Sequence, residues 1–182
     1  MPQPKKPAVF LDRDGVIITE RKYLIDPDGI ELIPGAIEAL VKLGAKYVEI
    51  VISNQSGVAR GYFSNSDVIK FNLALDKMLV ARGIIISSWY YCPHGPDDSC
   101  DCRKPRPGMI QRAVTEMPID LEQSWMIGDK SSDIGCGKAL GLRTILVRTG
   151  YGGREPGASE LQPDFVAADL LEAAYIILDD RE

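Results

Sequence analysis

The sequence alternates short runs of β-branched and apolar residues with longer segments of helical periodicity. Several of the short runs are apolar throughout, as is typical of parallel strands that helices cover on both faces. The pattern predicts an α/β, doubly wound, Rossmann-like parallel sheet with right-handed crossovers. Strands are predicted at residues 8–11, 47–53, 84–92, 124–128, 144–149 and 165–168, and helices at residues 34–45, 64–83, 107–117, 131–141 and 168–178.

Composition narrows the class of protein. The 182 residues, 45% hydrophobic and 26% charged, contain no linker, so we expect one domain over residues 1–182. The net charge of −5 argues against general binding to nucleic acid or to an anionic membrane. No apolar run has the length of a signal peptide or a membrane span, so a cytoplasmic protein is predicted. No long amphipathic stretch is left over, which favours a monomer.

Polar clusters follow four of the predicted strands. DRDG (residues 12–15) follows the first strand, and SNQSG (residues 53–57) overlaps the end of the second. RKP (residues 103–105) comes after the third, and GDKSSD (residues 128–133) follows the fourth. In open α/β sheets, ligands bind beyond the carboxyl ends of the strands. We therefore expect these clusters to converge on one edge of the sheet.

The residue types in these clusters indicate phosphoryl chemistry. Carboxylates that lie together repel one another unless a cation neutralises them, and all-oxygen ligation suits Mg²⁺. Asp12, at a strand end beside such a cation, can act as a nucleophile and form an aspartyl phosphate. Asp14, two residues further on, can protonate the leaving oxygen and later activate water.

The sequence resembles the haloacid dehalogenase (HAD) superfamily, because its four motifs are matched in order by FLDRDGVI, SNQ, RKP and GDKSSD. The DxDG form of the first motif resembles the phosphatases of that superfamily. The resemblance spans residues 9 to about 150 and implies no separate cap domain, since no stretch of suitable length is available. It implies that Asp12 is the nucleophile and Asp14 the general acid and base. The implied phosphoryl contacts are Ser53 and Lys104, and the implied Mg²⁺ ligands are Asp12, the backbone carbonyl of Asp14, and Asp129. Asp133 is expected as a further ligand or as an outer carboxylate that orients Lys130 or a metal-bound water.

A second metal is predicted in the loop at residues 92–102. Cys92-x-His94 and Cys100-x-Cys102 form two close pairs in a segment too polar for a core. Three thiolates and one imidazole favour tetrahedral Zn²⁺, and four protein ligands leave no open position, so the zinc would be structural. This anchor would also position the two cations that follow it, Arg103 and Lys104. Arg103 could bind a second anionic group of the substrate through a forked pair of hydrogen bonds.

The zinc loop resembles those of two groups of HAD phosphatases, which act on histidinol phosphate and on D-glycero-D-manno-heptose 1,7-bisphosphate. Three further segments look more like the second group: SNQSGVARGYF, CRKPRPGM and VRTGYG. This resemblance implies removal of the 7-phosphate during the synthesis of nucleotide-activated heptose for lipopolysaccharide. The implied partner is a small sugar phosphate. The candidate substrate contacts are Glu20, Arg21, Lys22, Tyr23, Asn54, Gln55, Ser56, Arg103 and Lys130.

Three alternatives remain open. Histidinol phosphate could be the substrate. A zinc-stabilised binding module without catalysis would share the fold, although the intact set Asp12, Asp14, Lys104 and Asp129 argues against it. A phosphorylation-dependent switch would keep its aspartyl phosphate, whereas a general acid and base at position 14 shortens the life of that intermediate.

Overall fold

The computed structural model describes residues 4–160 and 162–179. Its six strands are all parallel and form one sheet in the order β3-β2-β1-β4-β5-β6. The doubly wound prediction is therefore confirmed, and every strand named in the described residues belongs to this sheet. The strands are β1 (Lys6–Leu11), β2 (Val48–Asn54), β3 (Ser88–Cys92), β4 (Ile119–Gly128), β5 (Arg143–Val147) and β6 (Phe165–Ala167).

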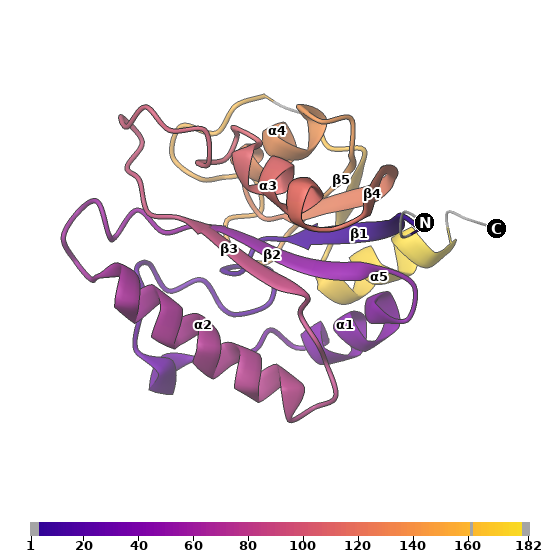
Figure 1. Cartoon of the computed structure of the whole chain (residues 1–182), viewed down its shortest axis with the longest axis horizontal. Helices are drawn as coiled ribbons and strands as arrows, with labels where there is room; N and C mark the ends of the chain where they lie inside the picture. Colours follow the sequence, from indigo (N-terminus) through magenta and orange to yellow (C-terminus); the bar gives the residue numbers. More distant parts are fainter. Residues whose placement is uncertain (1–3, 161, 180–182) are drawn as a thin grey trace.

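Helices cover both faces of the sheet. In Figure 1, α3 and α4 lie on one side of it, and α1, α2 and α5 lie on the other. Within the described residues, no helix has the length and apolar character needed to cross a membrane. The helices are α1 (Ala36–Gly44), α2 (Asn65–Val80), α3 (Gly108–Glu116), α4 (Ser131–Lys138) and α5 (Leu170–Asp179), with a short 3₁₀ helix η1 (Pro27–Gly29) before α1.

The central strand β1 contributes side chains to two hydrophobic cores, because successive side chains alternate between the two faces of the sheet. Val9 and Leu11 pack with the buried residues of α1, α2 and α5. Ala8 and Phe10 pack with those of α3 and α4. All four are fully buried, so β1 is held rigidly from both sides. The residue that follows it, Asp12, continues the ladder through its N–H to the Ile127 carbonyl (3.0 Å).

Two strands begin at least four residues away from their predicted starts. β4 begins at Ile119 rather than at residue 124, and its first residues pair with the start of β1 across a register shift between Pro7 and Val9. Its polar middle, Glu122 and Gln123, is exposed, which hides the strand from the hydrophobic pattern. β3 begins at Ser88 rather than at residue 84. Ser64 and Asp67 form a capping box at the start of α2, since the side chain of each bonds to the other's backbone N–H.

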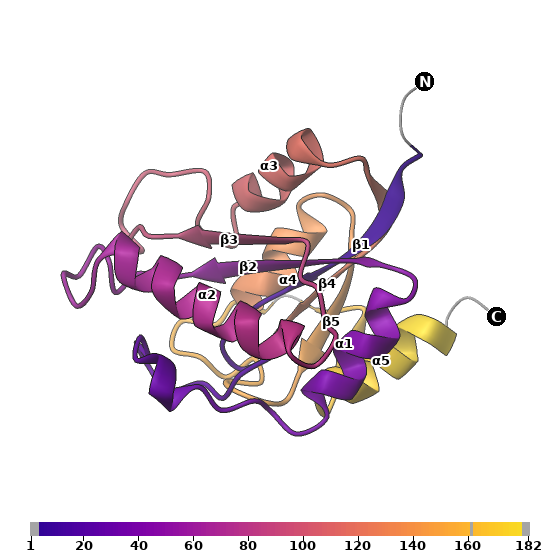
Figure 2. The same ribbon diagram turned by 60° about the horizontal axis from the view of Figure 1, so that its bottom comes forward.

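The loops that leave the carboxyl ends of the strands gather at one edge of the sheet. The segment between β1 and α1 and the loop after β2 lie on one side of that edge, and the loop between β3 and α3 projects beside them (Figure 2). These loops take the place that a separate cap would occupy.

Candidate active site

A buried lysine lies at the centre of the strand-end cluster. Lys104 is 3% exposed, and its Nζ lies 3.0 Å from Asp12 Oδ1 and 2.7 Å from Asp133 Oδ1. The ammonium also donates to the Ile52 carbonyl (2.7 Å). Burial disfavours the charged lysine, but the two carboxylates more than offset this and raise the pKa of Lys104. Lys104 therefore stays charged beside Asp12.

Asp12 is held as a carboxylate. It is 4% exposed, and its Oδ1 also accepts from the backbone N–H of Arg13 (2.8 Å). Burial alone would raise its pKa, but the charges of Lys104 and Lys130 outweigh that effect and lower the pKa of Asp12. An ionised oxygen at the end of β1 is what a nucleophile requires.

Asp129 is a fully enclosed carboxylate of the site. It is fully buried, and its Oδ2 accepts from the Tyr151 N–H (2.8 Å), while its Oδ1 accepts no hydrogen bond within the described part of the chain and lies 3.5 Å from Lys130 Nζ. Burial, and then the negative charge of Asp12, raises the pKa of Asp129 to about 8. Gly15 and Gly150 enclose this carboxylate so closely that a Cβ on either would lie 2.4 or 2.2 Å from Oδ2. Both have positive φ, so only glycine suits these positions.

These carboxylates fit a hard divalent cation. Asp12, Asp129 and Asp133 each offer an oxygen within 4.8 Å of the others. A cation would neutralise the cluster and give Asp129 Oδ1 a closer partner than Lys130, whose Nζ is 3.5 Å away. Asp133 is already engaged, because its Oδ2 accepts from the Lys130 N–H (3.0 Å) and its Oδ1 pairs with Lys104. The geometry thus favours Asp12 and Asp129 as ligands and gives Asp133 an outer, orienting position.

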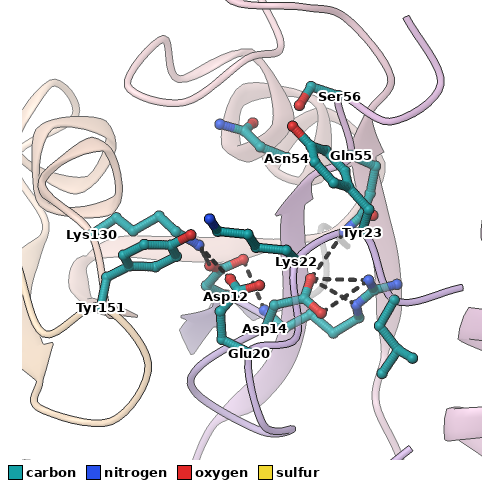
Figure 3. A pocket seen from close by; sticks show the side chains of 12 residues that line it. Asp12, Asp14, Glu20, Lys22, Tyr23, Asn54, Gln55, Ser56, Lys130 and Tyr151 are labelled. Carbon is teal, nitrogen blue, oxygen red and sulfur yellow. Dashed lines mark hydrogen bonds and ion pairs between the residues drawn. The ribbon is translucent and has the colours of Figure 1, made fainter. Parts of the chain in front are cut away.

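A cleft of about 270 Å³ opens above Asp12. Figure 3 shows Lys130 and Tyr151 on one side of Asp12, and Tyr23 and Gln55 on the other. Lys130 Nζ forms an ion pair with Glu20 (3.1 Å) and lies 4.9 Å from the Tyr151 ring centre. Of the predicted substrate contacts, those that line the cleft are Glu20, Lys22, Tyr23, Asn54, Gln55, Ser56 and Lys130.

Three residues line the cleft without having been predicted to do so. They are Arg13, Leu24 and Tyr151. Tyr151 lies in the wall of the cleft, beside Lys130. Its position depends on the bond between its backbone N–H and Asp129, which is a long-range contact with no local sequence signal.

Two predicted substrate contacts lie outside the lining. Arg21 is exposed and pairs with Glu31 on the surface. Arg103 donates to the backbone carbonyl of His94 (3.2 Å), so it lies against the loop at residues 92–102. Their roles in substrate binding stay predictions. Lys22 and Tyr23, which do line the cleft, have positive φ values of 23° and 59°, a strained backbone for residues other than glycine.

The predicted zinc ligands come together. Cys92 Sγ lies 3.1 Å from Cys102 Sγ, 3.8 Å from Cys100 Sγ and 3.4 Å from His94 Nδ1, and His94 Nδ1 lies 3.2 Å from Cys102 Sγ. Metal–ligand lengths of about 2.0–2.3 Å put the corners of a zinc tetrahedron roughly 3.3–3.8 Å apart. The four thiols of the chain are free, so no disulfide competes with this use. The residues fit Zn²⁺.

Hydrogen bonds connect this Cys/His loop to the active site. Asn54 donates its Nδ2 to the Lys104 carbonyl and accepts from the Lys104 N–H at its Oδ1, both at 3.1 Å. The Gln55 N–H donates to the Cys92 carbonyl (2.7 Å). The end of β2 and the Cys/His loop thereby fix the backbone from which Lys104 extends toward Asp12.

Comparisons with known proteins agree with this geometry. A HAD-hydrolase-like family model matches residues 101–173. The D-glycero-beta-D-manno-heptose-1,7-bisphosphate 7-phosphatase of Pasteurella multocida is 40% identical over 94% of this chain and 97% of its own length. The Pseudomonas aeruginosa protein of the same name is 36% identical over 93% and 97%. This chain belongs to the heptose bisphosphate phosphatase family of HAD-like hydrolases.

A solved member of the heptose bisphosphate phosphatase family has the same fold. The D,D-heptose 1,7-bisphosphate phosphatase of B. bronchiseptica superposes with a TM-score of 0.83 at 32% identity, covering 96% of this chain and 99% of that one. That protein was crystallised with magnesium and phosphate. Membership of this family makes the chain an enzyme that hydrolyses phosphate esters.

Proposed function

We propose that this protein removes the 7-phosphate of D-glycero-D-manno-heptose 1,7-bisphosphate, with Mg²⁺, in the synthesis of nucleotide-activated heptose for lipopolysaccharide. The observation that carries the proposal is the buried set of Asp12, Lys104 and Asp129 beneath an open cleft, in a chain 40% identical to phosphatases named for this substrate. The placement of these residues supports phosphoryl transfer, and the relatives support the sugar.

The residues of the chain account for both halves of the reaction. An oxygen of Asp12 attacks the phosphorus and forms an aspartyl phosphate, while the bond to the sugar oxygen breaks. Asp14 gives its proton to that oxygen, and the dephosphorylated sugar leaves. Asp14 then takes a proton from water, whose oxygen attacks the phosphorus, and inorganic phosphate leaves as the Asp12 carboxylate returns. Lys104 and the Ser53 hydroxyl would hold the transferring group.

Two metals would complete the site. Asp12 and Asp129, with the backbone carbonyl of Asp14, would hold Mg²⁺, which would neutralise the carboxylates and the phosphoryl oxygens. Cys92, His94, Cys100 and Cys102 would hold a structural Zn²⁺ that fixes the loop before Lys104. The bonds between Asn54 and Lys104 extend that fixation to the phosphate position.

The walls of the cleft fit a sugar carrying negative charge. Lys22 and Lys130 bring cations to the lining, and the Glu20 carboxylate is already paired with Lys130. The cationic amine of histidinol would therefore find no unpaired carboxylate in Glu20. Arg103, on the neighbouring loop, remains our candidate for the second phosphate.

The deciding experiment measures phosphate release with Mg²⁺ from both anomers of the heptose 1,7-bisphosphate and from histidinol phosphate. We expect a strong preference for the bisphosphate, with the β anomer favoured, as the names of the relatives suggest. Preference for histidinol phosphate would preserve the chemistry and reject the substrate. Release from neither, by a folded protein loaded with metal, would reject the phosphatase proposal.

A further inference from the structure

A buried arginine stands beside the general acid of the proposed reaction. Arg13 is 1% exposed, although its side chain carries a permanent charge. Its Nε and Nη2 donate to Asp14 Oδ2 and Oδ1, both at 3.1 Å, which makes a forked, two-bond contact with the carboxylate. A forked contact fixes the plane of a carboxylate as well as its distance, which a single hydrogen bond does not do.

The arginine is itself anchored. Its Nη1 donates to Asn72 Oδ1 (2.8 Å), and its guanidinium carbon lies 4.4 Å from the centre of the Phe71 ring. Both residues belong to α2, and both are buried. Arg13 thus connects the loop after β1 to a helix that packs on the sheet. This connection holds the guanidinium still while it holds Asp14.

The other contact of Asp14 also comes from a buried group. The Gln55 Nε2 donates to Asp14 Oδ2 (3.0 Å) and to Ser53 Oγ (2.5 Å). Asp14 is 15% exposed on the cleft side, so it can reach a bound ligand while its partners lie behind it. Each guanidinium nitrogen of Arg13 is already engaged, by Asp14 or by Asn72.

We propose that Arg13 is a positioning residue that acts through Asp14, holding its carboxyl where it can protonate the leaving oxygen and later accept a proton from water. This rests on the proposed function, since it assigns acid and base chemistry to Asp14. Positioned acid and base catalysis contributes about 10²–10⁴ in rate. Loss of Arg13 should remove most of that contribution and leave binding of the substrate intact.

Leaving-group dependence tests this proposal. A sugar alkoxide needs a proton as it leaves, whereas 4-nitrophenolate leaves without one. In Arg13→Lys and Arg13→Met, the single-turnover rate of sugar release from heptose 1,7-bisphosphate should fall about 10²-fold with substrate affinity within about twofold, while the single-turnover rate of 4-nitrophenolate release falls less than about threefold. Hydrolysis of the aspartyl phosphate is common to both substrates and should slow equally for both. In the Asp14→Asn background, adding Arg13→Met should cause no further loss, because the two residues act as one unit.

The control separates positioning from a general loss of packing. Leu75→Ala removes a fully buried side chain one turn further along α2, so it should lower the melting temperature without changing the ratio of the two rates. Equal losses in the rate of leaving-group release from both substrates in Arg13→Lys, a loss confined to substrate affinity, or additive losses in the double variant would each overturn the proposal. The lysine variant keeps the buried charge, so it carries the test if the methionine variant does not fold.

A failure of the substrate assignment can be told apart from a failure of this proposal. If wild-type protein does not release phosphate from the heptose bisphosphate, the same comparison is made between glycerol 3-phosphate and 4-nitrophenyl phosphate. Glycerol 3-phosphate also has an alkoxide leaving group. A selective loss on it in Arg13→Lys supports the positioning role whatever the natural sugar is, and an equal loss on both rejects it.

Discussion

Glu49 should make the stability of the protein fall as the pH rises. It is the second residue of β2, is 3% exposed, and its Oε1 has no hydrogen-bond partner among the described residues. Burial raises the pKa of Glu49 to about 8, from a usual value of 4.5. The folded state therefore holds this proton more tightly than the unfolded state. The contribution of Glu49 to the free energy of unfolding is therefore fully present below about pH 4.5 and is lost progressively as the pH rises to 8.

The size of the effect follows from the shift. Each pKa unit corresponds to about 1.4 kcal/mol, so roughly 2 kcal/mol of unfolding free energy should be lost between pH 6 and pH 8 through this one group. Glu49→Gln cannot titrate. The free energy of unfolding of the variant minus that of wild type should therefore increase by about 2 kcal/mol over this range.

Urea unfolding of both proteins at pH 6, 7 and 8, with metals held constant, measures this difference. Taking the difference between the two proteins cancels the titration of all groups that they share. Phosphatase activity at pH 7 serves as a control, because Glu49 lies well before the site residues at the end of β2. A difference that stays constant from pH 6 to pH 8 would refute the reasoning and show that Glu49 is ionised in the folded protein or solvated by water.

Three further predictions concern the site. Asp12→Asn should lower kcat by a factor of at least about 10³, while its thermal melting transition still shows a folded protein. Turnover near that of wild type would exclude Asp12 as the nucleophile. Cys100→Ser should lower the zinc content found by atomic absorption, and the stability, more than it changes the Mg²⁺ dependence of the rate; full zinc occupancy would contradict the ligand set. Asn54→Ala removes both bonds to the backbone of Lys104, so kcat should fall about tenfold, and an unchanged kcat would show that the Cys/His loop alone positions the lysine.

Most of the fold could be predicted because the strands of a parallel sheet are buried on both faces and read as apolar runs. The same logic predicted the site, since Asp12 and Asp129 each follow such a run directly and the carboxyl ends of parallel strands meet at one edge. The Cys/His loop could be predicted as well, because ligands two residues apart need little tertiary structure to approach one another.

What the sequence could not provide are contacts made across the fold. The bond from Arg13 to Asn72 joins residues 59 positions apart, and that from Tyr151 to Asp129 joins residues 22 apart, with no periodic pattern to reveal either. Asn54 was predicted to contact the substrate, and the structure shows both ends of its amide engaged by Lys104. Nor does an apolar pattern mark the start of β4, where exposed polar residues interrupt the strand.

The order of the strands has a consequence for synthesis of the protein on the ribosome. β1 is the first strand made, yet in the sheet it lies between β2 and β4. Until β4 emerges, the nascent chain can assemble only β3, β2 and β1, which leaves one edge of β1 uncovered. That edge is a template for pairing with other chains, so the interval before β4 is made is when aggregation threatens most. Asp129 follows β4 directly, so the cluster of Asp12, Asp129 and Asp133 is completed just after the step that covers the free edge of β1.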